Sequence, residues 1–272
     1  MVAVKMFRLC STARQVSEYA AGWLHRQPAV KEESLTDWLL DYFDQKSTGI
    51  RYYQFTRHEE GRSSGADWDW WILLSHGCFK IRVQAKKLKK NHDHYQDLAS
   101  SNKTGYQLDV LLDSSARFNF YPIYSLYGFS EGVGRCARTI RPEPLHICSA
   151  QEIYDLVFSD PRSRLNSSTL LALSIPLTCL FCCPLYIVAP DANAGDLFDH
   201  YFTTPPSPRG GHDEGNPDRN RGFELETPPI IKQLFNIEEI NDNTEPILRF
   251  YQETFPGSNG VGIIRPDRQI EG

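Results

Sequence analysis

The chain has 272 residues, of which 40% are hydrophobic and 12% aromatic, enough apolar material for one or two packed domains. The composition therefore excludes an intrinsically disordered protein. The formal net charge of −5 excludes a protein that is basic throughout, so any polyanion would have to bind at a local basic patch.

Two helices are predicted near the start of the chain. Apolar residues at helical spacing indicate a helix over residues 12–26, which Pro28 ends, and a second helix from about Glu33 to Gln45. The preceding stretch, MVAVKMFRLCSTARQ, lacks the apolar segment of a secretory signal.

Strand patterns follow. Residues 50–61 are rich in aromatic and β-branched side chains, and GADWDWWILLSHGCFKIRVQAKKL (65–88) reads as two strands with a two-residue turn at His76-Gly77. We expect these three strands to be antiparallel. Mixed loop and short helix follow over 91–105, then a helix over 106–118 and a strand over 119–129. This order predicts an α/β (α+β) fold with a central mixed sheet flanked by helices.

The second half of the chain has weaker signals. We expect a helix over 147–158, buried strands within 170–189, a mobile loop over 203–222, and a further helix at about 244–254 before terminal turns. Pro176 and Pro184 argue against a membrane span in 170–189. We therefore predict one domain over 1–272, with a core of about 31–190 and a C-terminal extension over 223–272.

Cysteine and histidine groups offer two alternative metal sites. Cys179, Cys182 and Cys183 resemble a metal knuckle, but their apolar neighbours and the missing second knuckle favour buried core thiols. His92-Asp93-His94 lacks a third ligand and favours a surface turn. Seven cysteines without a regular framework fit a reducing cytoplasm.

The hairpin over 65–88 carries an unusual polar face. Alternation places Lys80, Arg82, Gln84 and Lys86 on one side of its second strand. With a turn at His76-Gly77, Asp69 would pair with Gln84 and Asp67 with Lys86, which gathers two carboxylates, an amide and an amine. The set is either an ordinary solvated sheet face or a site for a divalent cation such as Mg²⁺ or Mn²⁺.

A helix with Glu33, then Asp67 or Asp69 and Gln84-Ala85-Lys86 across a hairpin, then a helix and a strand, resembles the PD-(D/E)XK restriction-endonuclease-like nucleases. Gln84 stands where these nucleases more often have Glu. More narrowly, GADWDWW, RVQAKKL, YQLDVLL, PIYSLYGF and LTCLFCC are similar to a bacterial domain family of unknown function, over roughly residues 31–190.

The resemblance implies a metal-dependent phosphodiesterase with a restriction-endonuclease-like core. Asp67 would be the main metal ligand, with Asp69 as the alternative; Gln84 would supply a side-chain oxygen, and Ala85 a backbone carbonyl. Lys86 would position the attacking water, and Glu33 would reach the metal or its waters. Gln107 is either a polar helix residue near this site or an exposed glutamine.

Six Lys or Arg and no acid occur between residues 80 and 92. They form either a solvated edge or a track for phosphates, to which Arg82, Lys87, Lys89 and Lys90 would contribute without reading bases. The function expected is that of a cytoplasmic DNA endonuclease, and the frequent use of this nuclease class in anti-phage defence suggests that role. This class is compatible with a homodimer and with partner proteins of a defence system. The alternatives are a catalytically inactive nucleic-acid-binding or scaffold protein, and an RNA-cleaving effector.

Overall fold

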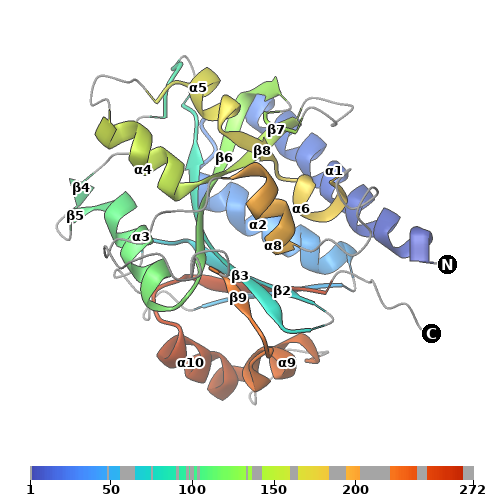
Figure 1. Ribbon diagram of the computed structural model, residues 1–272. Coiled ribbons are helices and arrows are strands. Elements are labelled where there is room, and N and C mark those ends of the chain that lie inside the picture. The colour runs from blue at the N-terminus through green and yellow to red at the C-terminus, as the bar shows by residue number, and fades with distance from the viewer. Residues whose placement is uncertain are drawn as a thin grey trace.

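The protein was analysed as a computed structural model, which describes residues 2–47, 49–55, 65–74, 76–89, 92–95, 98, 101–102, 105–132, 134–136, 143–159, 165–183, 194–202, 221–237 and 244–265. These residues form a central mixed sheet flanked by helices, as predicted (Figure 1). The order of its main strands is β1-β10-β2-β3-β6-β7-β8, with β9 beside β3. The strands of this sheet are β1 (Ile50–Gln54), β2 (Trp68–Leu73), β3 (Cys78–Lys87), β6 (Tyr121–Gly132), β7 (Glu143–Ser149), β8 (Ser174–Pro176), β9 (Phe223–Glu224) and β10 (Gly260–Ile264).

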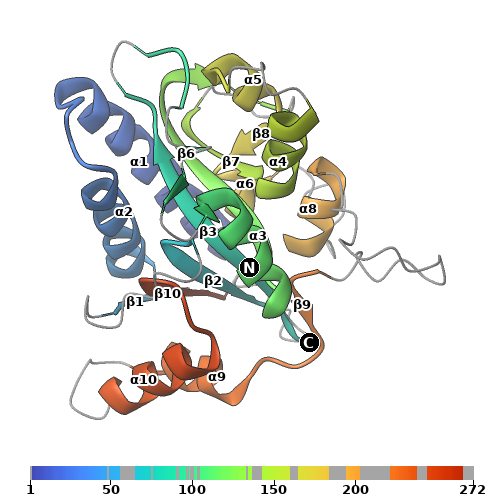
Figure 2. The same ribbon diagram turned by 90° about the vertical axis from the view of Figure 1, so that its left-hand side faces the viewer.

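Helices cover both faces of the sheet. The described helices are α1 (Val2–Arg26), α2 (Glu32–Lys46), α3 (Gln107–Arg117), α4 (Ala150–Ser159), α5 (Ser167–Ala172), α6 (Cys179–Cys182), α8 (Ala194–Tyr201), α9 (Pro229–Phe235) and α10 (Thr244–Thr254). Helices α1 and α2 lie on one side of the sheet, and α3 and α4 on the other (Figure 2). A separate two-stranded ladder joins β4 (Ser101–Asn102) to β5 (Gly105–Tyr106).

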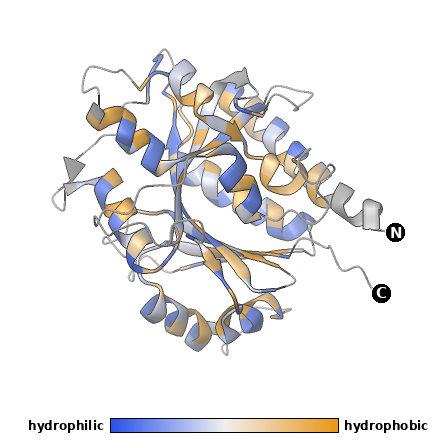
Figure 3. Ribbon diagram, in the orientation of Figure 1, coloured by the Kyte–Doolittle hydropathy of each residue, from blue (hydrophilic) through white to orange (hydrophobic). Residues whose placement is uncertain are grey.

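The core is divided between the two faces. One apolar cluster joins α1 and α2 to the side chains of β3 that include Phe79, Ile81 and Val83. On the opposite face, α3 and α4 pack over Tyr124 and Leu126 of β6. Helices α9 and α10 pack with β1, β10 and part of β2; α10 carries hydrophilic and hydrophobic residues in turn, as a helix half-covered by a sheet should (Figure 3).

The β2–β3 hairpin is antiparallel as predicted, but its register differs by two residues. Asp69 pairs with Arg82 and Leu73 with Cys78, so four residues rather than two connect the strands. Gly77 has a φ of 90°, and a Cβ there would lie 1.9 Å from the carbonyl oxygen of Glu224, which β9 brings against the turn. Because a shift of two residues preserves the side-chain alternation, the polar residues still share one face.

The C-terminal segment is part of the sheet and not an extension beyond a core of 31–190. Strand β10 lies between β1 and β2, antiparallel to the first and parallel to the second. The expected direct pairing of β1 with β2 is therefore wrong. Gly262 lies opposite Trp70, and a Cβ there would be 2.7 Å from the Trp70 ring. The glycine makes room for the indole, and it also weakens the strand signal of this segment in the sequence.

Other sequence expectations have mixed outcomes. The helices expected at 106–118 and 244–254 are confirmed as α3 and α10. Of the buried strands expected in 170–189, β8 is present, while α5 and α6 occupy most of the other described residues of this stretch, and residues 184–189 lie outside the described residues. Ile147–Ser149 belong to β7, so α4 begins later than expected. Residues 203–220 of the expected loop lie outside the described residues. Within the described helices, none is long and apolar enough to cross a membrane.

Candidate active site

The carboxylate of Asp67 is the centre of the polar group on the hairpin. Asp67 immediately precedes β2, and its Oδ2 accepts hydrogen bonds from Nε2 of Gln84 at 2.6 Å and from the backbone N–H of Ala85 at 2.7 Å. Both donors bind Oδ2, so neither of them occupies Oδ1. The register of β2 and β3 thus joins Asp67 to Gln84 rather than to Lys86.

A chain of side-chain amides continues from Asp67 to α3. Gln84 Nε2 also donates to the carbonyl oxygen of Ala85 at 3.1 Å, and Gln84 Oε1 accepts from Nε2 of Gln107 at 2.7 Å. Gln84 is only 2% exposed, whereas Gln107 is partly buried at the first position of α3. Of the two alternatives for Gln107, the structure favours the one that places it near the site.

Lys86 lies at the same end of β3 and faces a glutamate of α2. Its Nζ is 3.7 Å from Oε1 of Glu32, and the side chain is largely buried. The other oxygen of Glu32 accepts from the backbone N–H of Lys87 at 2.5 Å. Glu33, the residue expected here, is exposed.

The buried residues of α2 could have identified Glu32 from the sequence. They are Leu35, Thr36, Leu39, Leu40 and Phe43. Glu32 precedes Leu35 and Thr36 by three and four residues, and these spacings place it on the same face of the helix. Because Glu32 and Glu33 are adjacent at the start of the helix, the sequence prediction chose the wrong one of the two for the site.

Burial raises the pKa of Asp67 to about 7. The Ala85 N–H and the Lys86 ammonium oppose this rise, while the nearby Glu32 and Glu33 carboxylates add to it. The three carboxylates outnumber the two nearby ammonium groups, those of Lys86 and Lys87, so the cluster is short of positive charge. A cation at Asp67 would relieve both the repulsion and the cost of burying the ionised carboxylate.

Two further features lie beside this cluster. Tyr124 lies beside Gln84 in the parallel β3–β6 register, and its buried hydroxyl has no hydrogen-bond partner among the described residues. Helices α2 and α3 both begin at the site, and neither has a side-chain hydrogen bond at its N-cap. The partial positive charge of a helix N-terminus favours anions such as phosphate.

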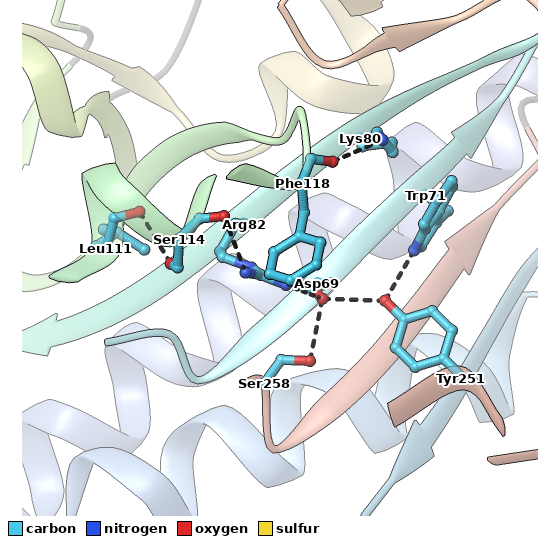
Figure 4. A network of polar contacts seen from close by, with 9 residues as sticks. All are labelled: Asp69, Trp71, Lys80, Arg82, Leu111, Ser114, Phe118, Tyr251 and Ser258. Atoms are coloured by element: carbon cyan, nitrogen blue, oxygen red, sulfur yellow. Dashed lines mark hydrogen bonds and ion pairs between the residues drawn. The ribbon is translucent and has the colours of Figure 1, made fainter. Parts of the chain in front are cut away.

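Asp69 has a different role from Asp67. It accepts a two-pronged ion pair from Arg82, with Nε to Oδ1 at 2.8 Å and NH2 to Oδ2 at 3.0 Å, and both side chains are fully buried (Figure 4). Tyr251 and Ser258 also donate to Asp69 Oδ2, at 3.0 and 3.1 Å. Because these donors occupy both oxygens, the structure does not support Asp69 as a metal ligand.

The expectation that Arg82 contacts nucleic acid is not supported, because its side chain is buried. Its guanidinium carbon lies 4.4 Å from the centre of the Phe120 ring, in addition to the ion pair with Asp69. Lys80, on the same face, donates to Phe118 O and to Glu224. This end of the polar face is therefore an internal network under α10, and Figure 4 shows Tyr251 of that helix reaching it.

The remaining residues of the basic run differ in their surroundings. Lys87 is partly buried, and its Nζ donates to the carbonyl oxygens of Pro28, at 3.0 Å, and Val30. Lys89 is exposed. Lys90 lies outside the described residues. As a phosphate track, the run would therefore begin at Lys89, two residues beyond the end of β3.

Comparison with known proteins gives one match. A family model described as a family of unknown function (DUF6615) matches residues 9–265. No curated protein and no solved structure matches the chain.

Proposed function

We propose that this chain, which belongs to the DUF6615 family of unknown function, is a divalent-metal-dependent phosphodiesterase that cleaves nucleic acid. The observation that carries the proposal is the convergence of Asp67, Gln84, Ala85 and Lys86 with Glu32 in one cluster. The Asp67 carboxylate, whose pKa burial raises to about 7, is neutralised either by a proton or by a cation, and hard oxygen donors suit Mg²⁺ or Mn²⁺.

The donor set fits such an ion. Asp67 would hold it through its carboxylate, Gln84 through Oε1 and Ala85 through its carbonyl oxygen, and water would complete the coordination. The buried Tyr124 hydroxyl offers a hydrogen-bond partner for such a water. When bound, the ion would polarise a phosphate and lower the pKa of a bound water.

Gln84 would have to turn its amide to present oxygen. In the structure its NH₂ group faces Asp67, where a hydrogen-bond donor takes the place of a cation. Rotation about the last side-chain torsion exchanges Nε2 and Oε1 at nearly the same positions. Gln107 can follow by turning its own amide, because an amide can either donate or accept. A glutamate at position 84 would lack the donor that satisfies Asp67 in the metal-free protein.

Lys86 is the group that would act on the phosphate. Its ammonium is held near Glu32 in a largely buried position, where a positive charge acts more strongly than in water. In this role it would orient the attacking water and stabilise charge that develops on the phosphate. Glu32 would hold Lys86 in place and accept the N–H of Lys87, which fixes the end of β3.

The proposal extends to the fold and the substrate. We propose a restriction-endonuclease-like core formed by α2, the β2–β3 hairpin, α3 and β6, since α3 leads from the hairpin to a strand parallel to β3. DNA is the proposed substrate and the cytoplasm the proposed location, and the sequence resemblance implies a role in anti-phage defence with partner proteins. An inactive nucleic-acid-binding protein on this fold is the second candidate, because Gln84 removes a negative charge from the metal site.

The test is to incubate the purified chain with supercoiled plasmid DNA and, in parallel, with single-stranded RNA. Each substrate is tested with Mg²⁺, with Mn²⁺ and with a chelator. Nicking of the plasmid that requires the metal supports the proposed function. RNA cleavage alone would replace DNA by RNA as the substrate, and binding without cleavage of either would favour the inactive alternative.

A further inference from the structure

Three cysteines from two segments of the chain, one after β6 and one around α6, lie together in the core. Cys136 follows β6, Cys179 is the first residue of α6 and Cys183 directly follows that helix, and all three are buried. Their sulfur atoms all lie within 4.8 Å of one another. We propose that these thiolates, together with the hydroxyl of Tyr201, bind a structural Zn²⁺ ion. This set differs from the Cys179, Cys182 and Cys183 knuckle considered from sequence.

The spacing of the donors fits one tetrahedral ion. With Zn–S bonds of about 2.3 Å, the sulfur atoms of a tetrahedral site are about 3.8 Å apart, so the three cysteines need to approach by about 1 Å or less. Tyr201 Oη lies 3.4 Å from the sulfur atoms of both Cys136 and Cys183. A tetrahedral site with a Zn–O bond of about 2.0 Å requires about 3.5 Å between oxygen and sulfur.

The oxygen donor distinguishes this cluster from ordinary core thiols. Buried cysteines commonly pack as small apolar groups, but here a tyrosine hydroxyl points into the group of sulfur atoms. Binding Zn²⁺ would replace the three thiol protons, which leave to the solvent, and would give the hydroxyl an electrophilic partner. Thiolate donors select a thiophilic ion over Mg²⁺, so this site is chemically distinct from the cluster around Asp67.

The ion would tie α8 to the rest of the fold. Tyr201 is the last residue of α8, and its carbonyl oxygen accepts from Arg135, the neighbour of Cys136. Arg135 also binds both carboxylate oxygens of Glu152 in α4. Phe198 of α8 packs against Phe79 and Tyr121, with ring centres 5.2 and 4.8 Å apart. A metal at the three cysteines would therefore fix this helix against the central strands.

The experiment measures metal in the full-length chain purified without chelator. Elemental analysis should find about one zinc per chain, and Co²⁺ replacing it should give the absorption bands of tetrahedral thiolate coordination. Cys136→Ser and Cys179→Ser should each lose most of the zinc. Tyr201→Phe keeps the three thiolates but removes the proposed oxygen ligand, so it should weaken the zinc affinity by at least roughly tenfold, the lower end of the loss for a group that only supports a ligand.

Cys78→Ala is the matched control, because Cys78 is equally buried but lies in the cluster under α9 and α10. It should keep its zinc. A wild-type chain that takes up neither zinc nor Co²⁺ would overturn the proposal, and this test does not depend on the folding of any variant. Zinc retained in both serine variants, an iron–sulfur cluster in place of zinc, or a disulfide between two of the three cysteines would also overturn it.

Discussion

Gln84 donates a hydrogen bond of 2.6 Å to the carboxylate of Asp67 from the neighbouring strand. The amide satisfies a carboxylate whose pKa is raised to about 7 by burial. It does so without adding a charge, and its own oxygen remains bound to Gln107. A divalent ion that binds Asp67 would have to break into this pair.

Metal binding at Asp67 should depend strongly on pH. Below a pKa of about 7 the carboxylate holds a proton that the metal must displace. The affinity for Mg²⁺ or Mn²⁺ should therefore fall by up to about tenfold per pH unit as the pH drops from 7 towards 4. Calorimetric titration at several pH values measures this. A flat affinity over that range would contradict the assignment of Asp67 as the main ligand.

The stability of the metal-free protein should show the opposite trend. An aspartate whose folded pKa exceeds its unfolded value of 3.8 favours the folded state in its protonated form. That contribution is fully present below about pH 4 and is lost as the pH rises to about 7. Urea unfolding across this range should show the decline, and Asp67→Asn should remove its part of it. An unchanged pH profile in the variant would count against the raised pKa.

Gln84→Glu should trade stability for metal affinity. It places another carboxylate beside Asp67 and removes the donor to Oδ2, so the metal-free protein should lose about 1–3 kcal/mol of unfolding free energy at pH 8. It also adds an anionic ligand, so Mg²⁺ should bind more tightly. Unfolding with and without Mg²⁺ measures both effects. Gln54→Glu, on the exposed end of β1, is the control for added charge. Lower Mg²⁺ affinity in Gln84→Glu would contradict the site.

Asp69 and Asp67 should behave differently when replaced. Asp69→Ala leaves the buried Arg82 without its partner and should cost about 3–5 kcal/mol of unfolding free energy. Asp67→Ala should leave the protein folded and remove metal binding. Chemical unfolding and metal titration of both variants distinguish a structural aspartate from a ligand. If Asp69→Ala folds normally and loses the metal, the two roles are reversed.

Removal of the C-terminal segment should prevent folding. A chain that ends at residue 243 lacks α10 and β10, which exposes the edges of β1 and β2 and removes the Tyr251 and Ser258 donors to Asp69. Circular dichroism and gel filtration should find an unfolded or aggregated chain. A well-folded product would mean that the segment is an extension beyond a core that folds without it.

The polar face of the β2–β3 hairpin could be predicted from the sequence, because the alternation that reveals it lies within a few consecutive residues. Alternation along Lys80, Arg82, Gln84 and Lys86 survives the two-residue error in register, since a shift of two preserves the face. The division of this face into the Asp67 cluster at one end and the buried Asp69–Arg82 ion pair at the other could not be predicted. It depends on Tyr251 and Ser258, which are about 180 residues away from Asp69 in the chain.

Two other features of the structure, strand β10 and the cysteine cluster, could not be predicted from the sequence. Strand β10 is short and contains Gly260 and Gly262, which match no strand propensity and make sense only beside Tyr52 and Trp70. The cysteine cluster joins Cys136 to residues more than forty positions later, and spacing along a chain does not reveal such a contact. Both features depend on contacts between residues far apart in the chain, and a local sequence pattern does not reveal such contacts.

The central claim is tested most directly by the rate of plasmid cleavage with Mg²⁺ in wild type and Lys86→Ala, measured beside Mg²⁺ affinity. Lys86 would stabilise charge in the reaction without being a ligand, so the variant should bind Mg²⁺ nearly as wild type does and cleave at least about a hundredfold more slowly. Lys232→Ala, an exposed lysine on α9, should cleave like wild type. Equal cleavage by wild type and Lys86→Ala would contradict the account.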